Sequence, residues 1–300
     1  RVRGFASGRF NYNFALPAGD VDRFGNTLTA ATVKLDQVWV KFDVARIAYV
    51  TTGRQRIKWG SGRFWNPTDF LNQQTLDALN ASVFDERTGV ALLKVHVPIE
   101  SIGANLYGIG NFEGADSFES IGGALRTEWL LGPAEIALSA AAREGAPLRL
   151  GADATAAVGP FDLRVEAAVK HGDETPYFKG EYDLASLTIP KRTDRSDEWI
   201  PQVVAGAEIA IKYSDRDSVY IGAEYFYNGA GYKDASLYPW LLGASSYYEA
   251  IGEDALATST QKLFTPFYLG QHYVGAYAMF PSPGRWDEGS ITASTLANIS

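Results

Sequence analysis

Polar and apolar residues alternate one by one over much of this chain. Apolar Leu163 and Val165, for example, are separated by Arg164 and followed by Glu166. Successive side chains of a strand point to opposite faces, so this pattern predicts strands with one apolar and one polar face. A single strand of a soluble β-sandwich would show the same alternation. The number and length of the segments therefore have to decide between a soluble sheet and a membrane-spanning one.

Thirteen alternating segments follow one another along the chain, and many have 10–14 residues. Strands of soluble proteins usually have about five or six residues, whereas membrane-spanning strands need about nine or more. The lengths therefore favour membrane-spanning strands. The segments lie at 2–14, 37–44, 47–59, 89–98, 102–112, 122–131, 134–143, 148–158, 161–170, 201–213, 218–228, 267–280 and 288–300.

The connections between these segments are alternately short and long. Short turns lie near 44–45, 98–101, 132–133, 159–160, 214–217 and 281–287, and longer segments at 16–31, 60–88, 113–121, 144–147, 171–200 and 229–266. Outer-membrane barrels have short periplasmic turns and longer external loops. We therefore predict an all-β fold, a transmembrane antiparallel up-and-down β-barrel over 1–300 as a single domain. Because bacterial barrels usually have an even number of strands, at least 13 visible strands predict 14 or more in the complete protein, with the chain incomplete at one or both ends. A helical insertion in a long loop stays open.

Aromatic residues at the strand ends support a membrane location. Amphipathic rings favour the two headgroup layers, so two girdles are expected. The predicted external girdle contains Tyr12, Phe14, Trp59, Phe112, Tyr225, Tyr227 and Tyr268, and the periplasmic girdle contains Phe42, Trp129, Phe161, Tyr213 and Phe280. The alternative is the general enrichment of aromatic residues in strands.

Composition excludes several classes of function. The chain has no cysteine, so disulfides and cysteine metal ligands are impossible, and its three histidines are too far apart for an HExxH motif. The net charge of −8 disfavours a nucleic-acid partner. The chain contains no run of about 18 apolar residues, so the sequence predicts no transmembrane helix.

Catalytic and metal-binding motifs are weak. Ser61 lacks the full G-x-S-x-G pattern, and a pair such as Ser139 with His96 has no spacing that favours it. The loop from Asp20 to Gly25 offers oxygen ligands for calcium but lacks the glutamate of an EF-hand. We therefore predict no enzyme, no catalytic residues, no metal and no cofactor.

The polar face of the predicted strands supplies candidate pore-lining residues. Arg54, Arg56 and Lys58 alternate, which predicts a basic ladder on one face, with Arg46 further down the same strand. Such a ladder would attract anions, as charged rings select ions in other pores. The alternative is a salt-bridge lattice with Asp36, Asp43, Glu128, Glu166 and Glu224. The full predicted lining is Arg46, Arg54, Arg56, Lys58, Arg126, Glu128, Arg164, Glu166 and Lys170.

The loop 60–88 is too apolar for a freely solvated loop. We predict that it folds inward, with a short helix near 69–80, and narrows the channel through Phe64, Trp65, Asp69 and Phe70. The small residues of 134–143 and 148–158 would either make room for such a filling or widen the pore. Packing of the loop against other external loops is the alternative. In the loop 229–266, aromatic residues suggest a lid, a carbohydrate-stacking surface or a partner site.

The stretch from Gly53 to Asp69, with its Gly-Arg-Gln start and Trp-Gly turn, resembles Gram-negative outer-membrane barrels related to the alginate-export porins. Segments 268–273 and 281–284 resemble the same group. This resemblance implies a porin-like barrel and says little about the solute. The chain departs from the pattern because it ends at Ser300 without a terminal aromatic residue.

Taken together, these features predict a porin in the outer membrane of a Gram-negative bacterium. It would pass small polar, including anionic, solutes by passive diffusion. The expected partners are outer-membrane lipid and the solutes, with a homo-oligomer or a periplasmic partner left open. Two alternatives remain, a scaffold barrel that encloses an electron carrier or an exported polymer, and a barrel-embedded enzyme.

Overall fold

The structure is a computed structural model of the chain. It describes residues 1–14, 30–72, 89–173, 175–215, 217–261, 263–265, 267–281 and 289–300, apart from the side chain of Asn11. All structural statements below concern these residues.

Thirteen strands form one sheet in which each strand pairs antiparallel with the next strand of the sheet. The strands are β1 (Val2–Tyr12), β2 (Ala31–Val44), β3 (Ala48–Gln55), β4 (Val90–Ile99), β5 (Ala104–Asn111), β6 (Gly122–Leu131), β7 (Ala134–Arg143), β8 (Ala146–Val158), β9 (Phe161–His171), β12 (Trp199–Lys212), β13 (Ser218–Asn228), β14 (His272–Pro281) and β15 (Ser290–Asn298). The predicted fold class, all-β with an antiparallel up-and-down order, is confirmed.

Each predicted alternating segment overlaps one strand of the sheet, and three boundaries differ by more than two residues. β2 begins at Ala31, earlier than expected, and β3 ends at Gln55 instead of 59. β14 begins at His272, because the preceding Leu269 packs in the loop, where its carbonyl accepts a hydrogen bond from the Tyr232 N–H at 2.6 Å. Tertiary contacts therefore set these ends.

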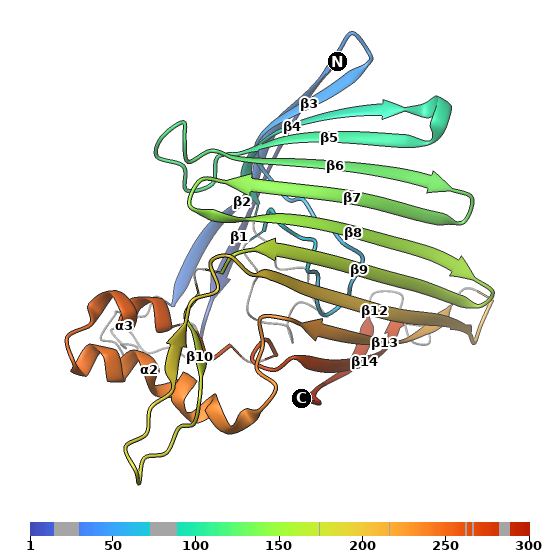
Figure 1. Ribbon diagram of the computed structural model, residues 1–300. Coiled ribbons are helices and arrows are strands. Elements are labelled where there is room, and N and C mark those ends of the chain that lie inside the picture. The colour runs from blue at the N-terminus through green and yellow to red at the C-terminus, as the bar shows by residue number, and fades with distance from the viewer. Residues whose placement is uncertain are drawn as a thin grey trace.

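The sheet curls strongly, so that β1 and β2 lie behind the middle strands (Figure 1). Among the described strands, β1 and β15 are the two edges, and they are not paired with each other. Thirteen antiparallel strands leave both edge strands running in the same direction. A closed barrel with antiparallel pairs alone would therefore need an odd number of further strands between these edges.

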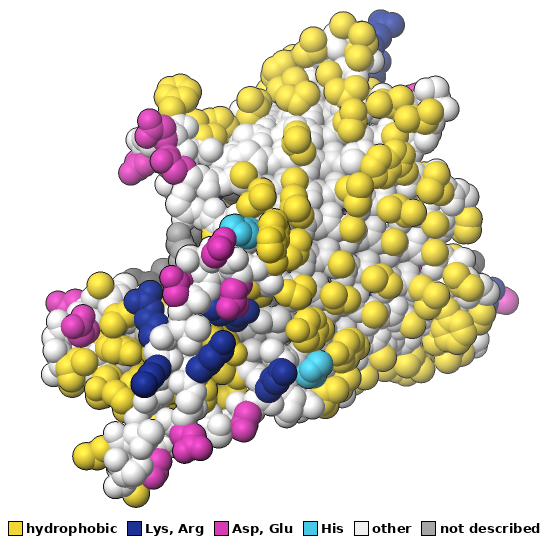
Figure 2. All heavy atoms as spheres, viewed as in Figure 1, with side chains coloured by type: hydrophobic (Ala, Val, Ile, Leu, Met, Phe, Trp, Pro, Cys, Tyr) yellow, Lys and Arg dark blue, Asp and Glu magenta, His cyan; other side chains and the backbone are white. Residues whose placement is uncertain are grey.

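The two faces of the sheet have inverted polarity. Large apolar side chains project into the surroundings from the convex face, and Figure 2 shows them spread over the strands with few charged residues among them. Examples are Val33, Leu35, Val40, Leu106, Leu125, Leu138, Leu150, Leu163, Val165, Ile221 and Val274. The concave face buries charged residues, namely Asp36, Arg126, Asp153, Arg164, Glu166, Glu208 and Glu224. A soluble protein buries the apolar set and exposes the charged one.

Aromatic residues lie near both ends of the convex face, as the girdles predict. Exposed rings are Phe42, Phe161, Tyr213 and Phe280 at the short-turn end, and Tyr12, Phe14, Phe112 and Tyr225 at the long-loop end. Two girdle assignments are wrong. Trp59 is buried in a concave-side cluster because β3 ends before it, and Tyr268 lies in a loop and packs against Phe226.

Two of the long loops form a small subdomain beyond the sheet (Figure 1). It contains a two-stranded sheet, β10 (Tyr177–Lys179) with β11 (Lys191–Thr193), and the helices α2 (Tyr238–Ala250) and α3 (Asp254–Thr260). Two single 3-10 turns are η1 (Glu100–Ile102) and η2 (Ala235–Leu237). A cluster around Phe178, Tyr232 and Trp240 holds the subdomain together. Within the described parts of the chain, no helix combines the length and the apolar character needed to cross a membrane.

Candidate functional site

The segment 56–72, which follows β3, lies against the concave face of the sheet. Glu166 on β9 is fully buried beneath it and accepts hydrogen bonds from the backbone N–H groups of Ser61 and Gly62. The Thr68 hydroxyl donates to the other carboxylate oxygen at 2.8 Å. The Glu166 carboxylate thus binds Ser61 and Gly62 at one end of a turn and Thr68 at the other. The N–H groups of Ser61 and Gly62 lie outside the sheet and have no partner strand.

Glu224 on β13 holds the next part of the segment in the same way. It accepts hydrogen bonds from the backbone N–H groups of Arg63, Phe64 and Trp65 at 2.7, 3.1 and 3.0 Å. A buried carboxylate is stable only when hydrogen-bonded or paired, and donors from the backbone satisfy that requirement here. The two carboxylates therefore fix the path of residues 61–68 across the sheet.

A third carboxylate, Glu208 on β12, pairs with cations from two sources. Arg63 of the segment lies 3.0 Å from it, and Arg164 of β9 lies 3.5 Å from it. The Tyr277 hydroxyl also donates to Glu208. The same tyrosine ring lies beneath the Arg63 guanidinium, 5.9 Å from its centroid. This group couples the segment to β9, β12 and β14.

Phe64 and Trp65 pack among aromatic residues of the last strands. Trp65 stacks on Phe226 with ring centroids 5.2 Å apart, and its indole N–H donates to the Phe267 carbonyl at 3.2 Å. Phe64 lies over Gly275 of β14, where an added Cβ would come within 2.6 Å of the ring. Both rings are almost fully buried. The glycine allows the ring to approach the strand backbone.

The other half of the segment packs on the earlier strands. Trp59 and Leu71 join Leu92 and Ile109 in one buried cluster. Phe70 reaches Gly151 of β8, where an added Cβ would lie 2.9 Å from the ring. The small residues of this part of the sheet therefore make room for the segment 56–72. This is one of the two interpretations that the sequence allowed for the small residues of 134–143 and 148–158. The expected helix near 69–80 lies largely outside the described residues, as does the rest of the loop from 73 to 88.

The predicted constriction residues Phe64, Trp65, Asp69 and Phe70 all lie in this concave-side segment. Asp69 is buried and accepts hydrogen bonds from the Asn72 side chain at 2.7 and 2.9 Å. Asn72 also donates to the Ile57 carbonyl at 2.5 Å. These contacts close the segment on itself at its far end.

The other predicted lining residues occupy separate parts of the wall. Arg126 pairs with Asp153 and Glu128, both at 2.7 Å, and its guanidinium lies 5.6 Å from the Trp59 ring centroid. Lys170 pairs with Asp173 at 2.6 Å at the long-loop end of β9. Of the carboxylates in the predicted lattice, Glu128 pairs with Arg126, whereas Glu166 and Glu224 bind backbone N–H groups.

The predicted alternation of Arg54, Arg56 and Lys58 along one strand face is wrong. β3 ends at Gln55, so Arg56 and Lys58 are not strand residues. Arg54 faces Val38 and Ala91 across the ladder and lies on the opposite face to the buried Gln55.

Both arginines of the predicted ladder form ion pairs with carboxylates. Arg54 pairs with Glu113 and Arg56 with Asp36, at 2.7 and 2.8 Å. Gly53, at φ 117°, occupies a conformation that only glycine adopts freely, and the regular alternation stops beside it. The ladder prediction assumed that the strand continued beyond this glycine.

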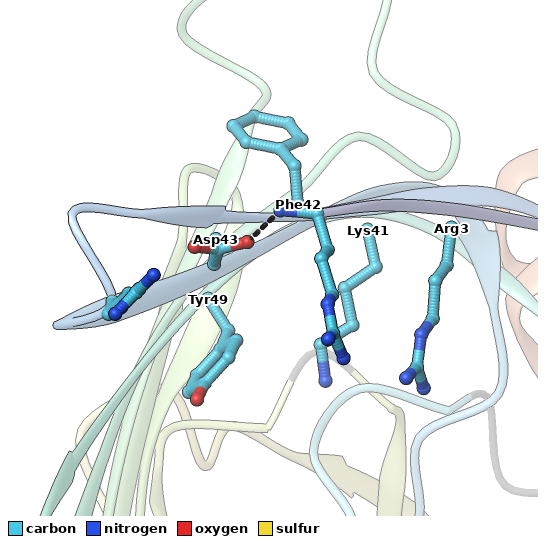
Figure 3. Close-up of a pocket in the computed structure, with 7 residues that line it drawn as sticks. Arg3, Lys41, Phe42, Asp43 and Tyr49 are labelled. Atoms are coloured by element: carbon cyan, nitrogen blue, oxygen red, sulfur yellow. Dashed lines mark hydrogen bonds and ion pairs between the residues drawn. The ribbon is translucent and has the colours of Figure 1, made fainter.

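A basic cavity of about 510 Å³ lies beside the β2–β3 turn. Figure 3 shows Arg3, Lys41 and Tyr49 extending from the same side of the sheet, with Phe42 on the other side. Its lining residues are Arg1, Arg3, Lys41, Phe42, Asp43, Arg46 and Tyr49. Of the predicted lining residues, Arg46 belongs to this cavity. Sequence reasoning missed Arg3 and Lys41, although both lie in segments with clear alternation.

Catalytic and metal-binding arrangements have little support among the described residues. Ser139 donates to the Gly151 carbonyl at 3.5 Å, and His96 contacts Asn105 at 2.8 Å, so the considered serine–histidine pair is not formed. No group of three or more acidic or histidine side chains suits a metal ion in the described ranges. The calcium-type loop at 20–25 lies outside these ranges.

Comparisons with known proteins give distant structural similarities. No family model and no curated protein matches the chain. The outer-membrane channel DcaP of Acinetobacter baumannii has a TM-score of 0.48 at 10% identity, over 98% of this chain and 73% of that one. OmpT of Vibrio cholerae, as a loop L8 deletion mutant, has a TM-score of 0.42 at 8% identity, over 83% and 68%.

Salmonella typhi OmpF, in a complex with daunomycin, has a TM-score of 0.46 at 9% identity, over 86% of this chain and 69% of that one. None of these three is described as an alginate-export protein, so that resemblance stays a prediction. The functional assignment therefore depends on the geometry of this chain.

Proposed function

We propose that this chain forms the wall of an outer-membrane porin that passes small polar solutes by passive diffusion. The inverted polarity of the sheet carries the proposal. Its convex face presents apolar side chains such as Leu163 and Val165, while its concave face buries Arg126, Glu166 and Glu208. Lipid outside and a polar lumen inside account for both faces.

In this proposal the segment 56–72 narrows the channel. It crosses the concave face from the β4–β6 side, at Leu92, to the β13–β14 side, at Phe226. The hydrogen bonds to Glu166 and Glu224 hold it there. A loop anchored in this way reduces the free cross-section of the lumen while the wall strands stay regular.

Liposome swelling tests the porin proposal directly. Proteoliposomes that contain the full chain should swell in isotonic solutions of small sugars and amino acids, because an open lumen admits them. Liposomes with heat-denatured protein are the control. Absence of swelling from correctly folded protein would contradict the proposal and favour a barrel whose lumen is occupied.

We further propose that the pore passes anions in preference to cations. Arg3, Lys41 and Arg46 line a cavity on the concave side that contains a single carboxylate, Asp43. A zero-current potential measured across a bilayer in a salt gradient should show preference for chloride, most clearly at low salt, where screening is weak. Preference for potassium would contradict the anionic part while leaving the porin proposal intact.

A further inference from the structure

Two neighbouring rungs of the β1–β2 ladder combine charge with aromatic surface. Arg3 lies directly opposite Lys41, and Phe5 lies directly opposite Trp39. The Phe5 and Trp39 rings stack with centroids 5.6 Å apart and planes at 26°. The rungs are two residues apart on each strand, which is about 7 Å. A pair of cations thus stands beside a pair of rings.

Both rungs face the concave side of the sheet. Trp39 lies opposite Gly53, and Gly53 lies opposite Leu92, which packs against the segment 56–72. Lys41 and Trp39 are two residues apart and share a face. Figure 3 shows Arg3 and Lys41 extending together from that side. The four side chains therefore lie on the wall of the proposed pore.

The positive charge of this site is poorly compensated. Among the described residues, no carboxylate forms an ion pair with Arg3, Lys41 or Arg46, and Asp43, which lines the same cavity, contacts the Arg1 amino group. Lys41 lies over the Tyr49 ring, 5.0 Å from its centroid. Like charges directly opposite each other destabilise a sheet. An anion bound between them would remove that repulsion.

The turn that carries Arg46 is strained. Ala45 and Arg46 adopt φ values of 52° and 60° between Val44 and Ile47, whose backbone groups close the turn at 3.0 Å. Two-residue hairpins with positive φ at both positions strongly favour Asn-Gly or Gly-Gly. An arginine in this place is conformationally unfavourable. In this conformation the Arg46 side chain lines the basic cavity.

From this juxtaposition we infer a binding site for a small anion whose charge is carried on a flat ring, the class of the aromatic carboxylates. The carboxylate accepts hydrogen bonds from the Arg3 guanidinium and the Lys41 ammonium. The ring of the ligand lies against Phe5, which is 46% exposed. The inference rests on the proposed function only in that the site lies on the wall of the pore.

Ligand-observed NMR titration of the full chain in detergent tests the site. The probes are 3-phenylpropanoate, acetate, which lacks the ring, and 3-phenylpropanol, which lacks the charge. 3-Phenylpropanoate should bind about tenfold more tightly than either of the other two, a difference equivalent to about 1.4 kcal/mol. Equal affinity for acetate and 3-phenylpropanoate would overturn the inference.

Variants of the charged rung and of the aromatic rung test the two parts of the site separately. R3Q/K41Q should weaken binding of 3-phenylpropanoate about tenfold, and F5A should abolish its advantage over acetate. K191Q/R192Q removes the same charge from the exposed strand β11 and should bind like the wild type. Should R3Q/K41Q fail to fold, R3Q and K41Q singly carry the test, each with about a threefold loss. Wild-type affinity in the folded charge variants would overturn the inference.

Binding in detergent does not require an open pore, so the two proposals fail separately. Selective binding of 3-phenylpropanoate without liposome swelling would contradict the porin alone. Swelling without selective binding would contradict the ring-anion site alone.

Discussion

Buried carboxylates direct the chain inside this sheet. Glu166 and Glu224 accept hydrogen bonds from seven donors of the segment 61–68. An inward segment cannot extend the sheet, so its N–H groups lose water and need other acceptors. Charged acceptors are the strongest available, since a hydrogen bond to a charged group contributes about 1.5–3 kcal/mol.

Replacement of Glu224 by glutamine should loosen the segment around Arg63. The amide loses the charge and places an NH₂ group among three N–H donors. Trypsin cleavage after Arg63 should become at least about tenfold faster, since each 1.4 kcal/mol changes the open population tenfold. The rate is measured by mass spectrometry of folded protein. Glu135→Gln, at an exposed position of β7, is the matched control, and equal rates in both variants would contradict the role of Glu224.

A glycine of the wall sets how closely an aromatic residue approaches. In Gly275→Ala the new Cβ would meet the Phe64 ring, so the free energy of unfolding should fall by about 1–3 kcal/mol. Gly123→Ala places the same methyl group where nothing lies within 4 Å and should leave stability unchanged or slightly higher. Urea titration in lipid vesicles measures both. An equal effect of the two substitutions would show that Phe64 does not pack on β14.

At the scale of elements, β3 is short and the chain leaves the sheet after it. β3 has 8 residues, whereas its neighbour β2 has 14. The sequence continues the alternation to Trp59, but Gly53 and the burial of Trp59 beside Leu92 turn the chain onto the concave face. The early end of β3 therefore produces the inward segment.

Removal of this segment should widen the proposed channel. Replacement of residues 61–72 by a Gly/Ser linker should raise single-channel conductance in planar bilayers, because a filling anchored on the wall is lost. The β10–β11 hairpin lies away from the sheet, so shortening its loop at 181–189 should leave conductance unchanged (Figure 1). Unchanged conductance in the 61–72 variant, with the barrel still folded, would place the segment outside the conducting path.

At the scale of the whole molecule, polarity distinguishes a membrane protein from a soluble sheet. Val165, on β9, projects from the convex face and is 49% exposed, while its neighbours Arg164 and Glu166 are buried. Water would penalise the exposed apolar band, and lipid would stabilise it. On β6, Leu125 is likewise exposed beside the buried Arg126.

An arginine on the convex face should therefore impair folding into lipid. Val165→Arg should reduce stability in vesicles by about 2–4 kcal/mol, the cost of arginine near the bilayer midplane. Leu184→Arg adds the same charge at a more exposed apolar residue in the β10–β11 hairpin and should be tolerated. Equal stability of the two variants would argue for a sheet that faces water.

The alternation of the chain was sufficient to predict the strand order, because side-chain direction in a strand depends only on position and each strand pairs with the next. The same reasoning placed Arg126, Arg164 and Glu166 on the polar face, where the structure buries them. The apolar residues Phe64 and Trp65 also marked their loop as one that has to be covered.

Other features depend on partners that are distant in sequence. Sequence alternation assigned Arg54 and Arg56 to one ladder, but their partners Glu113 and Asp36 come from other parts of the chain. Glu224 was considered a cation partner and instead binds N–H groups more than 150 residues away.

The sequence by itself determined the alternation, the strand number and the apolar face, because these follow from local geometry. The tertiary structure alone decided where β3 ends, which cations remain uncompensated and how residues 61–68 are held. Burial leaves each polar group dependent on whichever partner the folded chain places beside it.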